Sequence, residues 1–136
     1  MYYSKYGDIM LEEYNKLKEN NNDKIVFIKR GYFYYTYFRD SYIMSYIFNY
    51  KAVESRCSFP ITNKVNVCNK LNELNIGYVI DNDIIYGDSE VYNDYFIKGY
   101  NKVKYDILID EINNKLITLD IDKLVCIRNK LYEHNK

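Results

Sequence analysis

The spacing of hydrophobic residues predicts a helix and then strands at the start of the chain. Over residues 8–20, apolar residues recur near helical spacing with charged residues on the other side, and Asp8 can cap the helix. The polar run NNND then ends it. The next apolar run, IVFI at residues 25–28, has no polar alternation, which is typical of a strand buried on both faces.

An unusually aromatic run follows, KRGYFYYTYFRD at residues 29–40, with six aromatic residues in seven consecutive positions. Aromatic side chains suit a pleated, half-buried surface, so the run predicts a second strand. Strand alternation would bury Tyr34 in the core and place Phe33 and Tyr35 on the other face. Because Gly31 lets the chain turn just before, we expect Phe33 to be exposed near a strand end.

The following fifty residues predict two more helices and two more strands. In chain order these are a helix over residues 39–49, a connector over 54–63, a helix that starts at 62 or 63, and strands over 76–81 and 83–88. Asp40 or Ser41 can cap the first of these helices, and Thr62 or Asn63 the second. Pro60 holds the residue before it in an extended conformation.

This order of elements predicts an α/β fold, a mixed β-sheet flanked by helices, over residues 1–90. Residues 91–136 form a C-terminal extension that we expect to be helical and packed on the same domain. Apolar residues follow helical spacing from Tyr105 to Leu119, and Asp120 can cap a last helix. A hairpin turning at residues 113–114 is the alternative for this part; we favour two helices.

Composition indicates a globular protein: 48% of residues are hydrophobic and 28% charged. The 19 basic and 19 acidic side chains cancel, so no overall field attracts nucleic acid or an anionic membrane. The start of the chain carries no signal-peptide core, and no apolar run is long enough to span a membrane. The three cysteines form no CxxC pair and are expected to be reduced thiols. We therefore expect a cytoplasmic protein.

Candidate catalytic chemistry is sparse. The one histidine, His134, stands near the end of the chain, where no nucleophile constellation can be built around it. No phosphate-binding glycine motif occurs, so we expect no nucleotide, no cofactor and no ATP hydrolysis. Acidic pairs such as Asp81 and Asp83 suit turns better than a metal site. We expect a non-enzyme, with a nuclease-like activity through carboxylates in IDND and DILIDE left open.

Cations flank the aromatic run, and this combination is typical of nucleic-acid binding. Lys29, Arg30 and Arg39 can meet phosphates, while aromatic rings stack on bases at roughly 1–3 kcal/mol each. Core packing accounts for only one face of a strand, so the second aromatic face is a candidate surface for a ligand.

Several of these segments, taken in order, resemble the N-terminal mismatch-recognition domain of the MutS DNA mismatch repair family, over roughly residues 10–85. The family begins with a helix of Y-x-x-L-K type, as at residues 14–18, followed by an apolar strand. It continues with G-D-F-Y-E-x-F, which reads GYFYYTY here from Gly31, and a helix entered through Asp40-Ser41. A G-[IV]-P-x-H element follows in the family, for which SFPIT carries Pro60.

The resemblance implies that Phe33 is a wedge that inserts beside a mispaired base. The family's glutamate two residues later contacts that base, and here the position holds Tyr35; the family's aspartate before the wedge is Tyr32. We therefore expect a stand-alone, non-catalytic MutS domain I-like module that binds DNA, mismatched or distorted, weakly through Phe33, Tyr35 and the three cations. The alternative is a protein-interaction module that kept the fold and lost DNA binding.

Overall fold

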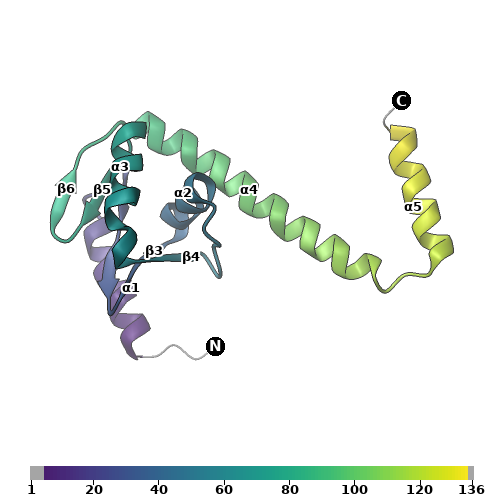
Figure 1. Cartoon of the computed structure of the whole chain (residues 1–136), viewed down its shortest axis with the longest axis horizontal. Helices are drawn as coiled ribbons and strands as arrows, with labels where there is room; N and C mark the ends of the chain where they lie inside the picture. The colour runs from purple at the N-terminus through teal and green to yellow at the C-terminus, as the bar shows by residue number, and fades with distance from the viewer. Residues whose placement is uncertain (1–4, 135–136) are drawn as a thin grey trace. The chain divides into compact units, whose positions relative to one another are not determined.

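A computed structural model of the chain describes the backbone of residues 5–134 and the side chains of residues 9–133 (Figure 1). The chain divides into two compact units, Met1–Val103 and Lys104–Lys136. Along the chain the elements are α1 (Lys5–Lys18), β1 (Lys24–Val26), β2 (Ile28–Arg30), β3 (Phe33–Tyr37), α2 (Phe38–Phe48), β4 (Arg56–Pro60), the 3-10 turn η1 (Ile61–Asn63), α3 (Lys64–Leu74), β5 (Gly77–Ile80), β6 (Asp83–Ile85), α4 (Ser89–Leu116) and α5 (Ile121–His134).

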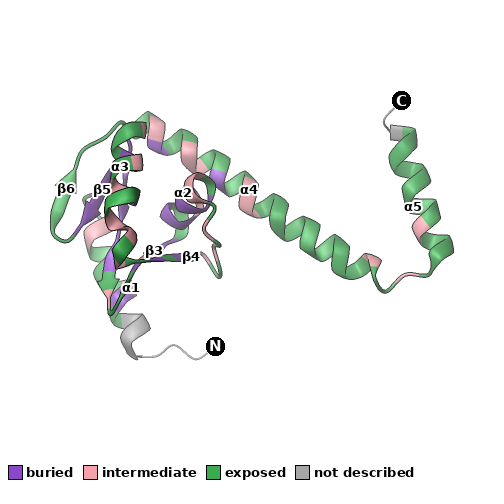
Figure 2. Ribbon diagram, in the orientation of Figure 1, coloured by how far each residue is buried: buried purple, intermediate pink, exposed green. Residues whose placement is uncertain are grey.

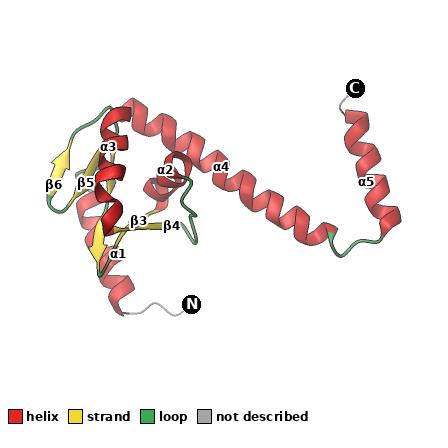
Figure 3. Ribbon diagram, viewed as in Figure 1, coloured by secondary structure: helices red, strands yellow, loops and turns green. Residues whose placement is uncertain are grey.

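The strands of the first unit form two three-stranded sheets flanked by helices, which confirms the α/β class (Figure 3). In one sheet β1 pairs parallel with β5, and β5 pairs antiparallel with β6. The other sheet is antiparallel in the order β2-β3-β4. The run at residues 25–28, expected as one strand, is divided at Phe27 between the two sheets, although all four residues are buried as expected.

The segment 54–63, expected as a connector, contains strand β4, so that expectation was wrong. Cys57 and Phe59 are buried while Arg56, Ser58 and Pro60 are exposed, which is the two-residue alternation of a strand with one free face. The proline is tolerated because β4 is an edge strand of its sheet and Pro60 is its last residue.

Two apolar clusters hold the sheets between helices. The larger cluster joins the strands to α2, α3 and the start of α4, through side chains such as Phe59, Ile43, Leu71 and Tyr92. The smaller one lies under α1 and includes Tyr14. Figure 2 shows the buried residues concentrated in these strands and in the helix faces that cover them.

The helix caps differ from expectation at two places and agree with it at a third. Helix α2 begins at Phe38 with no side-chain cap, so Asp40 and Ser41 do not cap it. Asn63 does occupy the N-cap position of α3, but its side chain makes no capping hydrogen bond. Asp120 caps the last helix as expected, because it accepts the Lys123 backbone N–H at 2.9 Å. The side chains of Asp8 and His134 lie outside the described residues.

The second unit consists of helical segments. Helix α4 is continuous through residues 105–116, which excludes a hairpin turn at residues 113–114. The four residues 117–120 connect it to α5. Among the described helices, none combines the length and apolar character that a membrane span requires.

Candidate functional site

Part of one face of the β2-β3-β4 sheet is open to solvent, and it carries Phe33 and Tyr35, alternate residues of the aromatic run. The register places Phe33 between Arg30 and Pro60, and Tyr35 between Ile28 and Ser58. Residues directly opposite each other on neighbouring strands point to the same side of a sheet. We call the exposed part of this surface the open face; it comprises Arg30, Phe33, Tyr35, Arg56, Ser58 and Pro60.

Helix α1 covers the rest of the same side, which fixes where the open face begins. Ile28 and Tyr37 pack in the cluster under α1, and Tyr35 lies against its margin. The opposite side of β3 carries Tyr34 and Thr36, which are 2% and 1% exposed. The aromatic run therefore divides by strand alternation, as expected, into a core set and a solvent-facing set.

Phe33 is 41% exposed at the first position of β3. Gly31 adopts a φ of +60° at the first position of the two-residue turn before it, as type II′ hairpin turns require. The Phe33 and Tyr35 ring centroids lie 6.4 Å apart. Because Phe33 keeps much of its ring in contact with solvent, the ring is available for contact with a ligand. This pair of rings is the most distinctive part of the open face.

Two arginines flank the rings from the two edge strands. The Arg56 guanidinium lies 5.7 Å from the centre of the Tyr35 ring, within cation–π range. Arg30 donates to Glu13 of α1 at 2.6 Å, and both side chains of this ion pair are partly exposed. Arg56 therefore presents the less neutralised cation. Arg56 was not among the predicted cations because residues 54–63 were expected to form a connector, although polar and apolar residues alternate from Arg56 to Phe59.

The other two cations expected at the site lie elsewhere. Lys29 pairs with Tyr34 in the register, so it is on the opposite side of the sheet from Phe33. Arg39 follows β3 in α2, and its guanidinium lies 4.5 Å from the centre of the Phe96 ring and 3.3 Å from the Asn93 side chain on α4. Phe33 and Tyr37 are four residue steps apart along the strand, about 13 Å, and Arg39 lies beyond. The structure does not bring Lys29 or Arg39 together with Phe33.

Asp40 forms a buried polar cluster behind the sheets. Its carboxylate is fully buried and accepts hydrogen bonds from the Tyr14 hydroxyl at 2.6 Å and the Tyr92 hydroxyl at 2.5 Å. It also accepts the Val26 backbone N–H at 3.0 Å and the Lys18 ammonium at 2.8 Å. Burial, then the neighbouring carboxylate, raises the pKa of Tyr14 and Tyr92, so both remain neutral donors. Every group in the cluster has a partner inside the fold, which indicates a structural role.

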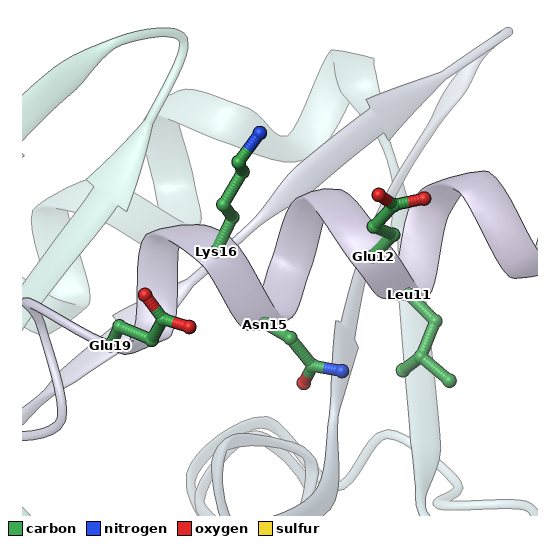
Figure 4. A pocket seen from close by; sticks show the side chains of 5 residues that line it. All are labelled: Leu11, Glu12, Asn15, Lys16 and Glu19. Atoms are coloured by element: carbon green, nitrogen blue, oxygen red, sulfur yellow. The ribbon is translucent and has the colours of Figure 1, made fainter.

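A separate shallow pocket lies on the outside of α1 and is lined by Leu11, Glu12, Asn15, Lys16 and Glu19 (Figure 4). Four of these side chains come from α1 and Glu19 follows directly after it, and none of the five belongs to the open face. Among the described residues, no group of three or more His, Cys, Asp or Glu side chains is placed to hold a metal ion.

Comparison with known proteins adds one finding. A family model described as MutS domain I matches residues 9–81, more than half of the chain. The matched region contains α1 from Ile9 onward, both sheets up to the end of β5, and the open face. The searches of curated proteins and of solved structures each found no significant match.

Proposed function

The chain belongs to the MutS domain I family, and we propose that it binds DNA through the open face without catalysing a reaction. The observation that carries the proposal is the pair of rings formed by the exposed Phe33 and the half-buried Tyr35, flanked by Arg30 and Arg56. Exposed rings beside cations on a sheet are suited to stacking on bases while the cations contact phosphates.

Each residue of the face has a proposed role. Phe33, the residue at the family's wedge position, inserts at a base step, which costs a few kcal/mol of unstacking and least at a mispair. Tyr35 contacts base or sugar through its hydroxyl, which can donate or accept a hydrogen bond. Arg30 and Arg56 neutralise phosphates on either side of the rings. Preference for mismatched or distorted duplex then arises because such sites open more easily.

The expected affinity is low. Two arginines release few counterions, one of them is already paired with Glu13, and the formal net charge is zero. We expect dissociation constants in the micromolar range or weaker for each open face. Binding should weaken with salt, with a shallow slope on a double-logarithmic plot that corresponds to about two phosphate contacts.

The test is a fluorescence anisotropy titration of labelled matched duplex, mismatched duplex and single-stranded DNA at two salt concentrations. Phe33→Ala should weaken binding roughly tenfold or more, the effect of losing one stacked ring. Tyr86→Ala is the matched control, because Tyr86 is 78% exposed and lies outside the open face. It should leave the affinity unchanged.

A second pair of variants distinguishes DNA binding by the open face from DNA binding by the opposite side of the sheet. Arg56→Gln should weaken binding to all sequences and reduce the salt slope by about one. Lys29→Gln removes the same charge from the opposite side and should have little effect. Equal losses of DNA affinity in both variants would show that DNA is attracted by positive charges spread over the protein and not bound by the open face. No detectable binding at low salt would reject the proposal and favour the protein-interaction module.

A further inference from the structure

The second unit, Lys104–Lys136, exposes almost all of its apolar side chains. Of its described residues, 104–133, none is buried, and only Leu116, Leu119 and Leu124 are partly buried. Eleven large apolar or aromatic side chains are at least 36% exposed there: Tyr105, Ile107, Leu108, Ile109, Ile112, Ile117, Ile121, Val125, Ile127, Leu131 and Tyr132. A helix with this much exposed apolar surface needs a partner to cover it.

The apolar stripe of the second unit is on a different side of α4 from the one used in the first unit. Tyr92 and Gly99 are the buried residues of α4. Further along, the stripe runs through Tyr105, Leu108 and Ile112. At about 100° per residue, its centre is rotated roughly 150° from the first set. The later stripe is therefore not a continuation of the packing face of Ser89–Val103.

A contact between α4 and α5 of one chain would not cover this surface. On α5, Ile121 and Val125 lie on one side, whereas Ile127 and Leu131 lie roughly 120° further round the helix, so one contact with α4 can cover only one of these pairs. Ile107 is likewise off the main stripe of α4. Chains below about 40 residues rarely bury enough surface to be stable alone and usually need disulfides, metals or oligomerisation. The described residues of this unit hold neither a disulfide nor a metal-binding cluster.

The apolar area of the second unit and the net charges of its two helices both suit a second copy of the same unit as the partner. Eleven side chains, each about half exposed, offer on the order of 700 Å² of apolar surface per copy, close to the roughly 800 Å² per partner of a standard stable interface. Residues 105–116 carry three acidic residues and one lysine, whereas 121–133 carry three basic and two acidic residues. An arrangement that sets α4 of one copy against α5 of the other joins opposite net charges, and two-fold symmetry makes the contact twice.

We propose that residues 104–136 are a dimerisation element, in which the end of α4 and α5 pack with the same two helices of a second copy as a four-helix bundle. This inference does not depend on DNA binding by the open face. The two proposals can therefore fail separately.

The test measures the mass of the full chain by sedimentation equilibrium from low to high micromolar concentration. We expect a concentration-dependent shift from 16.5 kDa to twice that mass. Ile112→Glu and Leu131→Glu place a charge on each helix and should each keep the chain monomeric. The control is Val65→Glu, on α3, where Val65 is 67% exposed, and it should dimerise as the unaltered chain does.

Hydrogen exchange of residues 105–133 guards against variants that merely unfold these helices. In the unaltered chain, protection of these amides should rise with protein concentration. A monomer at high micromolar concentration would overturn the proposal, as would protection that is independent of concentration, since the chain's own first unit would then cover the surface. A dimer that persists in both glutamate variants would place the interface elsewhere and also overturn it.

Discussion

Replacing Asp40 with alanine should destabilise the first unit more than any comparable change at its surface. The Asp40 carboxylate contacts three other elements of the fold: α1 through Tyr14 and Lys18, β1 through Val26, and α4 through Tyr92. Its side chain is 0% exposed, so water cannot replace it without opening the core. Alanine would remove this acceptor from two hydroxyl groups, one backbone N–H and one ammonium; the Tyr14 hydroxyl would keep the Tyr37 carbonyl, and Lys18 the Lys24 carbonyl.

The magnitude follows from these lost contacts. Removing one member of a buried ion pair costs about 3–5 kcal/mol, because the other charge is left uncompensated. Here the remaining charge is Lys18, whose side chain is 18% exposed and also donates to the Lys24 carbonyl at 2.5 Å. Burial already lowers the pKa of Lys18 against the opposing effect of Asp40, so without Asp40 the amine can lose its proton and limit the cost. We therefore expect a loss of about 3–4 kcal/mol of unfolding free energy.

Urea unfolding followed by far-UV circular dichroism measures this loss, since the chain has no tryptophan. With a slope of about 2 kcal/mol/M, the midpoint should fall by roughly 1.5–2 M. The control is Asp88→Ala, which removes an exposed carboxylate that caps α4 through the Glu90 and Val91 backbone N–H groups. It should cost about 1 kcal/mol. A loss below 1 kcal/mol for Asp40→Ala would refute the structural role.

Three further predictions concern stability. Phe33→Ala should change the unfolding free energy by less than about 0.5 kcal/mol, whereas Phe59→Ala, at a residue 1% exposed, should cost about 3–5 kcal/mol in the same urea titration; similar losses would mean that Phe33 is part of the core. Burial raises the pKa of the Cys57 thiol from 9.0 to about 12. The contribution of this thiol to the unfolding free energy is therefore fully present below pH 9 and is lost as pH rises towards 12. When pH is raised from 8 to 11, the unfolding free energy of Cys57→Ala should fall by roughly 3 kcal/mol less than that of the unaltered chain. Equal falls in the two proteins would exclude this contribution. Gly99→Ala should lower the melting temperature by the equivalent of about 1–3 kcal/mol, because its Cβ would lie 2.2 Å from the Tyr42 carbonyl oxygen; an unchanged melting temperature would show that the two helices can separate at little cost.

Local pattern was sufficient to predict the helices and the division of the aromatic run. Tyr34 and Phe33 went to opposite sides because strand alternation is a local property. Strand β4 was missed because Pro60 and the polar residues around it resemble a connector, although Cys57 and Phe59 alternate with exposed residues. Its recovery adds Arg56 to the open face. A short alternating segment is therefore informative even when a proline ends it.

Residues brought together by tertiary packing could not be found in this way. In the sequence, Asp40 stands at the end of the aromatic run and directly before an apolar stretch, which is the usual setting of an N-cap, although α2 already begins at Phe38. Its partners are distributed from Tyr14 to Tyr92, and nothing in the local sequence indicates them. Arg39 is adjacent to Asp40 in sequence, but the change from strand to helix at Phe38 carries it towards Phe96 of α4. Distance along the sequence was a poor guide to which cations flank Phe33.

The open face also departs from the family pattern in a way that bears on what it can select. Tyr35 stands on the open face where the pattern has a glutamate, and Tyr32 stands in the adjoining turn where the pattern has an aspartate, so two negative charges of the pattern are missing near the arginines. Fewer carboxylates mean less repulsion from phosphates, which favours general DNA contact. The glutamate would have supplied a charged acceptor for a base, whereas a tyrosine hydroxyl is a neutral donor or acceptor that pairs with any base edge. If the open face binds DNA as we propose, it should distinguish sites by how easily Phe33 can enter the base stack, and hardly by which base is mispaired.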